Sequence, residues 1–251
     1  MAVPLIGRIY RGYPIAVIVF LSTGLTVGMA QYAFGEFSGP LREEFGWTQT
    51  QLNMSLAFSF ISGVLAPFIG GITDRVGIRP VMFVSLLLIA LGFALRPLIS
   101  ELWHWYLFSA LVYAGFPGAT LLPAGKVVGV WFPKTRGRVM GTVVAGNNFG
   151  GMTMPPLAAG IIATMSWEAA YATFAVIMVV LAVVALVVVA ESDESVRSEM
   201  ERTGRGDLVK VSQAAAHTGI TVRQALRNRN FWLIMIGLVA ATFTYQGVLT
   251  Q

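Results

Sequence analysis

The chain has 251 residues, of which 56% are hydrophobic and only 12% are charged, and its mean hydropathy is +0.72. Soluble globular proteins carry about 25% charged residues, so this composition excludes an ordinary water-soluble enzyme, a coiled coil and a disordered chain. With no cysteine and two histidines, we expect no catalytic residues, no bound metal and no cofactor. The net charge is +5, and the positions of the basic residues indicate membrane topology rather than nucleic-acid binding.

Seven stretches lack Asp, Glu, Lys and Arg, and they indicate helices that cross a membrane. The hydrocarbon core of a bilayer is about 30 Å thick, so a spanning helix needs about 20 residues. The third stretch is short, but the Arg96 side chain can extend to the interface, so we expect this span to reach Ile99. The stretches cover 12–35, 45–73, 80–95, 102–125, 139–167, 169–190 and 230–251.

The sequence therefore predicts an all-α, polytopic membrane protein in three parts. A six-helix transmembrane bundle covers 1–190, a polar linker covers 191–229, and a seventh helix begins at 230 and is truncated at 251. Most of the 17 Lys and Arg residues fall on one side of the membrane if the N-terminus is inside, as the positive-inside rule requires. We thus expect a multi-pass protein of the cell (inner) membrane, with the N-terminus and the linker in the cytoplasm.

The six spans differ in polarity, which predicts how they pack. The third and sixth spans have almost no polar side chains, so they can face lipid on all sides. The first, second and fifth spans carry polar groups that lipid would leave unsatisfied, so these helices should line a cavity or pack together. Their polar residues are Ser22, Thr23, Thr26 and Gln31; Asn53, Ser55, Ser59 and Ser62; and Thr142, Asn147, Asn148 and Thr153.

Pairs of glycines four residues apart also recur in the spans. This spacing allows two helices to approach closely. Helices four and five contain further glycines and prolines, which favour either tight packing or bending during a transport cycle. The pairs are Gly24 and Gly28, Gly125 and Gly129, and Gly146 and Gly150.

Several polar side chains within the spans are candidates for binding a solute. Asn147 and Asn148 lie about 14 Å beyond Arg138 along a helix, near the midplane where transporters bind substrate. They serve either a solute or contacts between helices. Further candidates lie nearer the outer side or on the seventh helix: Gln31, Tyr32, Tyr113, Tyr245 and Gln246.

Two cations, Lys126 and Arg96, lie within or at the end of a span. An ionisable residue inside the membrane is a functional hypothesis by default, and both would suit a carboxylate solute. The alternative is that each side chain extends to the nearer interface. No Asp or Glu lies at mid-membrane, so the sequence predicts no proton-coupling carboxylate there.

Four segments carry a resemblance to a known family. The segment Gly70–Pro80, with Asp74-Arg75 between two glycines, resembles the loop between helices two and three of the major facilitator superfamily. The segment 131–141 resembles the loop between helices four and five in its monocarboxylate and oxalate/formate branches. The segments 34–47 and 225–232 resemble the first outer loop and the start of the seventh helix of those branches.

This resemblance implies a twelve-helix transporter with two six-helix halves that works by alternating access. It implies that the first and fourth helices line the cavity while the third and sixth lie outside. It also implies a cytoplasmic latch between the halves, formed by the loop residues Gly70, Asp74, Arg75, Gly77 and Arg79.

The resemblance predicts a secondary active transporter of a small organic anion, similar to a monocarboxylate, in contact with the lipid bilayer. The alternatives are a transporter of another small solute, of the drug or sugar type, or a non-transporting truncated half. A single half would need its missing C-terminal half or another copy to close the path. The sequence lacks the HExxH, P-loop and GxSxG motifs, so we expect no enzyme.

Overall fold

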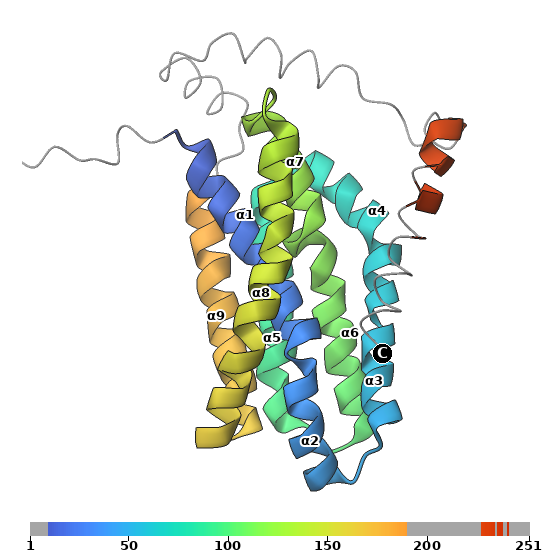
Figure 1. Ribbon diagram of the computed structural model, residues 1–251, viewed down its shortest axis with the longest axis vertical. Coiled ribbons are helices and arrows are strands. Elements are labelled where there is room, and N and C mark those ends of the chain that lie inside the picture. The colour runs from blue at the N-terminus through green and yellow to red at the C-terminus, as the bar shows by residue number, and fades with distance from the viewer. Residues whose placement is uncertain (1–9, 190–226, 234, 238–239, 241–251) are drawn as a thin grey trace, which may run out of the picture. The chain divides into compact units, whose positions relative to one another are not determined.

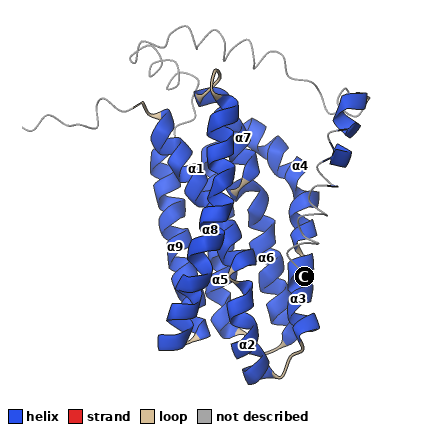
Figure 2. Cartoon of the chain, in the orientation of Figure 1, coloured by secondary structure: helices blue, strands red, loops and turns tan. Residues whose placement is uncertain are grey.

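A computed structural model describes residues 10–189, 227–233, 235–237 and 240, and every regular element in these residues is a helix (Figure 2). This confirms the predicted all-α class. The described residues fall into two separate units, 10–189 and a short second unit. The helices of the first unit are α1 (Gly12–Val27), η2 (Gly28–Tyr32), α2 (Phe34–Phe45), α3 (Gln49–Ala57), α4 (Ser59–Val76), α5 (Ile78–Leu95), η3 (Arg96–Leu98), α6 (Leu102–Ala119), α7 (Leu121–Trp131), α8 (Arg136–Thr164) and α9 (Trp167–Val188).

Five of the predicted spans are long and apolar enough to cross a membrane in the described part of the chain. They are α1 to α2, α3 to α4, α5 with η3, α6 to α7, and α9. The remaining span, α8, is 29 residues long, or about 43 Å, which exceeds a bilayer core. Its glycines, asparagines and threonines lower its hydropathy, as expected for one of the three polar spans.

The first span is longer than the sequence predicts. The segment 34–47 was expected to form an outer loop, but most of it is the helix α2, which continues from a π-helical turn, η2. The reason is that Phe34, Phe37 and Leu41 recur on one face of the helix and are all buried. The helix ends at Gly46, whose φ of 68° is left-handed, a conformation that glycine adopts without strain.

The second span, predicted over 45–73, runs from Gln49 to Val76 and has a clear local signal at each end. The Thr48 hydroxyl accepts from the Gln51 backbone N–H at 3.3 Å, and the Gln51 side chain accepts from the Thr48 N–H at 2.8 Å. Together these two hydrogen bonds form a capping box. At its other end, Gly77 has a φ of 96° and separates α4 from α5.

The fourth span is interrupted near its glycines and prolines. Helix α6 ends at Ala119, and Thr120 has non-helical backbone angles before α7 begins. The Ser22 hydroxyl of α1 donates to the Ala119 carbonyl at 2.5 Å, so a neighbouring helix satisfies a group that the break leaves unpaired. By contrast, Pro155 and Pro156 lie within an uninterrupted α8.

Helices α1 and α8 pack at two of the predicted glycine pairs, and Figure 1 shows them side by side. A Cβ on Gly28 would lie 2.7 Å from the Gly150 carbonyl oxygen, and one on Gly146 would lie 2.6 Å from the Phe20 carbonyl oxygen. The close crossing therefore requires glycine. In the third pair, a Cβ on Gly129 would lie 2.7 Å from a terminal nitrogen of Arg136 on α8, whereas one on Gly125 would meet nothing within 4 Å.

The expectation that the third and sixth spans face lipid on all sides is also wrong. Half of the apolar stretch of α5 with η3 is buried, against 6% for α3 and α4. Helix α5 packs against both α6 and α9, because their aromatic and small side chains interdigitate on one face of each helix. Only the opposite faces are exposed, through residues such as Val84, Leu91, Val176, Val180 and Val183.

In the second unit, residues 229–233 and 235–237 are helical. The Asn228 side chain accepts from the Asn230 N–H at 2.9 Å, so it caps the start of this helix. Residues 191–226 of the predicted linker 191–229 lie outside the described residues, as does most of the predicted seventh helix.

Candidate functional site

The most unusual charged residue is Arg96, in the turn that follows α5. Its side chain is only 4% exposed, although it carries a full charge. One terminal nitrogen lies 3.2 Å from the Ser109 hydroxyl of α6. Its Nε is buried without a hydrogen-bond partner. In the part of the chain that the structure describes, no carboxylate lies within ion-pair distance of this guanidinium.

Aromatic rings surround the guanidinium instead. Its central carbon lies 4.2 Å from the ring centre of Trp105, 4.5 Å from that of Tyr171 and 5.5 Å from that of Phe93. Rings at these distances attract a cation through their electron-rich faces. Tyr171 is in turn stacked on Phe37 at 3.8 Å, so α2, α5, α6 and α9 all contribute to one rigid aromatic cluster.

Two tyrosine hydroxyls complete this polar centre. Tyr113 is 2% exposed and Tyr171 is fully buried, and neither hydroxyl makes a hydrogen bond of normal geometry. Both hydroxyls lie within the electrostatic reach of Arg96, and Tyr113 also lies next to the Gln31 side chain. Gln31 is exposed, so Tyr113 has one neighbour at the surface of the bundle.

The structure thus brings together three of the residues selected from the sequence, Gln31, Tyr113 and Arg96. Sequence reasoning missed Trp105, Ser109 and Tyr171. The only sequence signal for them was the density of aromatic residues near the same predicted ends of three spans, which does not say which rings face each other.

Lys126, the second cation in a span, has a different environment. Its Nζ forms an ion pair with Asp74 Oδ1 at 2.7 Å, and both side chains are substantially exposed. The pair connects α7 with the last turn of α4. Lys126 therefore already has an acidic partner, whereas Arg96 has none among the residues that the structure describes.

The two asparagines selected from the sequence are on α8, a helix that contributes no residue to the aromatic cluster around Arg96. Asn147 is partly buried and its side-chain oxygen has no hydrogen-bond partner, whereas Asn148 is exposed. The Tyr32 ring packs against α8, 3.2 Å from the position of a Cβ on Gly151. Tyr245 and Gln246 lie outside the described residues.

The loop residues expected to form a latch are placed at the junction of α4 and α5. Asp74 is held by Lys126, and Gly77 supplies the turn. Arg75 is exposed, and Arg79 Nε donates to the Leu186 carbonyl of α9. A Cβ on Gly70 would meet nothing within 4 Å, so crowding in this bundle does not require glycine there.

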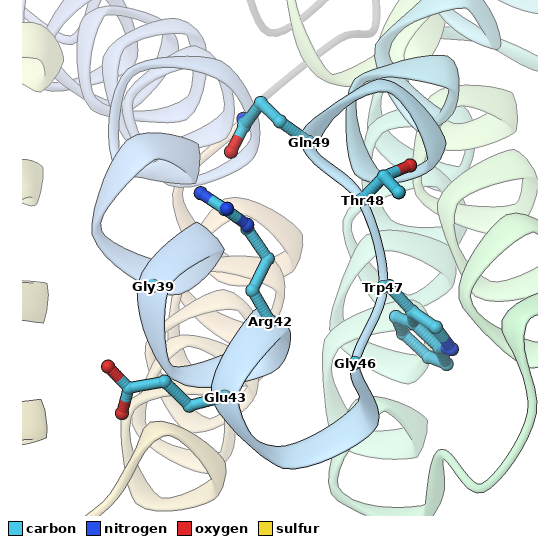
Figure 3. A pocket seen from close by; sticks show the side chains of 7 residues that line it. All are labelled: Gly39, Arg42, Glu43, Gly46, Trp47, Thr48 and Gln49. Atoms are coloured by element: carbon cyan, nitrogen blue, oxygen red, sulfur yellow. The ribbon is translucent and has the colours of Figure 1, made fainter.

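A surface hollow of about 500 Å³ lies between α2 and α3. Figure 3 shows the Arg42 side chain pointing toward Gln49, with Glu43 directed away. These charged side chains are exposed to solvent, so water already satisfies them. The hollow therefore lacks the buried, unsatisfied groups that distinguish the Arg96 cluster.

Comparison with known proteins identifies a family and several relatives that match most of the chain. A family described as the Major Facilitator Superfamily matches residues 14–251. The "Uncharacterized transporter YybO" of Bacillus subtilis (strain 168) is 26% identical over 84% of the chain and 49% of that protein. The "Tetracycline resistance protein, class C" of Escherichia coli is 28% identical over 73% of the chain and 45% of that protein.

A third relative is "Monocarboxylate transporter 11" of Homo sapiens. It is 28% identical over 63% of the chain and 34% of that protein. The chain thus spans about half of the length of the first two relatives, and about a third of the third. The names of the second and third relatives refer to different solutes at the same identity of 28%, so these relatives do not indicate which solute this chain would carry.

Proposed function

The chain belongs to the Major Facilitator Superfamily, and we propose that it forms the N-terminal half of a secondary active transporter that moves a small organic anion by alternating access. Family membership makes it a multi-pass membrane transporter of a small solute, not an enzyme. The solute class that we propose is a monocarboxylate.

The environment of Arg96 is the observation that carries this choice. A buried charge is costly unless it is paired and hydrogen-bonded, and contacts with aromatic rings offset only part of that cost. Arg96 has the rings and Ser109, but no acidic partner within the described residues. A carboxylate solute would supply the missing charge and acceptor atoms, whereas a sugar would leave the cation unpaired.

We propose that a second bundle closes the transport path, either from another copy or from further sequence. The exposed faces of α4 and α8 support this, because they carry large apolar side chains together with polar ones such as Asn148. Lipid would not satisfy the polar groups. The exposed apolar residues of these faces are Phe60, Val64, Phe68, Val144, Phe149 and Met152.

The proposed location is the cell's inner membrane, with the N-terminus and residues 191–229 in the cytoplasm. The placement of Lys and Arg along the chain supports this orientation. A protease-sensitive tag inserted between residues 195 and 220 should be cut only after intact cells are opened. Cutting in intact cells would contradict the orientation.

Uptake into liposomes tests the function. The purified chain is reconstituted at a density that lets copies associate, and exchange of labelled lactate is measured with pyruvate or glucose as competitor. We expect saturable exchange that pyruvate inhibits and glucose does not. Arg96→Gln should abolish it, and Arg42→Gln, which removes an exposed charge, should leave it unchanged.

Exchange that persists in Arg96→Gln, or that glucose inhibits as well as pyruvate does, would overturn the anion assignment. It would favour the alternative of a drug- or sugar-type solute. The absence of any saturable flux would favour the second alternative, a half that does not transport by itself. That alternative is supported by the low burial of α3 and α4, because only 6% of their most apolar stretch is buried within this bundle.

A further inference from the structure

We propose that a groove between α5 and α9 binds one acyl chain of a phospholipid, and that Glu168 at the end of this groove pairs with the ammonium of the lipid headgroup. The occupant is an aminophospholipid, phosphatidylethanolamine, in the leaflet nearer the start of α9. The inference needs only that the chain lies in a membrane, so it does not depend on the proposed solute.

The groove is apolar along its whole length. Its volume is about 620 Å³, within the range of pockets that hold small molecules, about 300–1,000 Å³. Four residues of α5 and five of α9 line it, and all of them are alanine, valine or leucine. None of these side chains can hydrogen-bond a polar solute, so the groove fits a hydrocarbon chain.

Small side chains where the two helices meet form the floor of the groove. Ala90 of α5 is 3% exposed and Ala175 of α9 is 7% exposed, whereas the larger lining residues Leu91 and Val179 are 48% and 43% exposed. The floor therefore lies between two ridges of larger side chains. The lining residues extend over about two turns of each helix, or about 12 Å, so the groove holds part of one extended acyl chain.

Glu168 lies at one end of this groove. It precedes the lining residues Ala172, Ala175 and Val179 by four, seven and eleven residues, which places it on the same face of α9. Its Oε2 is buried without a hydrogen-bond partner, and no cation lies within ion-pair distance of it among the described residues. The dipole of α9 favours an acid in its first turn but supplies no donor to this oxygen.

Two tryptophans indicate that Glu168 lies at the level of the lipid headgroups. Trp167 is the first residue of α9, and Trp103 in the first turn of α6 is 58% exposed. These helix starts lie at the same end of the bundle, because η3, which leads into α6, contacts α9. Tryptophan is enriched at the interface between membrane and water, so a chain in the groove would carry its headgroup to Glu168.

The charge at this end of the groove selects the headgroup. Lipid tails are as apolar as the groove itself, so burial of a chain alone gives little preference for one lipid. A primary ammonium supplies both a positive charge and N–H donors to the Glu168 carboxylate. Phosphatidylcholine has the charge without an N–H, and phosphatidylglycerol has no cation, so phosphatidylethanolamine should bind best.

The headgroup contact is tested by native mass spectrometry of the purified 251-residue chain in detergent, with dioleoyl forms of these three phospholipids. We expect phosphatidylethanolamine to bind about tenfold more tightly than phosphatidylglycerol, because a hydrogen bond between charged groups distinguishes them. Glu168→Gln should remove this preference. The matched control is Glu43→Gln, which neutralises an exposed acid of α2 at the same end of the bundle, where the neighbouring Glu44 accepts from the Trp167 side chain at 2.6 Å. This control should keep the preference.

The acyl-chain contact is tested separately by filling the groove. Ala172 is exposed and lines the groove, so Ala172→Phe should place a ring in the groove without disturbing the helix contact. We expect this variant to bind all three phospholipids more weakly. Val187→Phe is the control on the same helix, since Val187 is 71% exposed and lies outside the groove, and its lipid binding should not change.

Equal affinity of the parent chain for phosphatidylethanolamine and phosphatidylglycerol would overturn the inference, as would a preference that survives Glu168→Gln. Lipid binding that Ala172→Phe leaves unchanged would place the lipid elsewhere and would also contradict it. A dimer in lipid-free detergent that Ala172→Phe dissociates and Glu168→Gln does not would show that a second copy, rather than a lipid, occupies the groove.

Discussion

Substitution of Gly150 by alanine should separate two helices that the sequence brings into close contact. The added methyl group would clash with the Gly24 backbone of α1, because a Cβ at this position falls well inside contact distance of the Gly24 carbonyl. Helices α1 and α8 would have to move apart, and such overpacking costs about 1–3 kcal/mol. For a bundle of this size, the cost corresponds to a loss of about 5 °C in unfolding temperature.

The same helix provides the control. Gly160 also lies inside α8, but a Cβ there would meet nothing within 4 Å. Gly160→Ala should therefore keep or slightly raise the unfolding temperature, since alanine favours a helix more than glycine does. Both variants are compared by thermal unfolding in detergent, followed by tryptophan fluorescence. A Gly150→Ala chain as stable as Gly160→Ala would refute the close crossing of α1 and α8.

Three further predictions concern the connections between helices. Tyr10→Phe removes a buried hydrogen bond of 2.7 Å to the Trp131 carbonyl and should cost about 1 kcal/mol in stability to denaturant; an unchanged midpoint would argue against that bond. A double-mutant cycle with Lys126→Gln and Asp74→Asn should give a coupling below about 1 kcal/mol that weakens with salt, because the pair is exposed. A larger, salt-independent coupling would show that the pair is buried. Thr48→Ala should cost about 1 kcal/mol through loss of the capping box, and Thr48→Ser, which keeps the hydroxyl, should restore most of it if capping is the cause.

The predicted order of the spans rests on local properties, and these are what the sequence encodes directly. Runs of apolar residues set helix length, Thr48 and Gln51 set one helix start, and Gly77 sets one turn. The continuation of the first span into α2 could not be predicted in this way. It depends on the burial of Phe37 and Leu41 by other helices, which hydropathy does not report.

The candidate site could also be predicted only in part, because the sequence identifies its charged residue but not the residues from other helices that contact it. A charge at the end of a span identified Arg96, but its partners Trp105 and Tyr171 come from two other helices. Which face of each helix turns inward depends on the crossing of all the helices. A single sequence gives no measure of that crossing, so Lys126 and Arg96 appeared equivalent. Of the two, only Lys126 has an acidic partner within the described part of the chain.

The central claim is that the exposed polar face of α8 borders a water-filled path, whereas the exposed face of α9 contacts lipid. The chain has no native cysteine, so single-cysteine variants can be labelled without background. Asn148 on α8 is exposed, and Val180 on α9 is 57% exposed. Because neither side chain is covered by this bundle, a difference in labelling would report whether water or lipid surrounds each position. In membranes, a charged maleimide should label Asn148→Cys and leave Val180→Cys unlabelled, while equal labelling of the two variants would contradict the account.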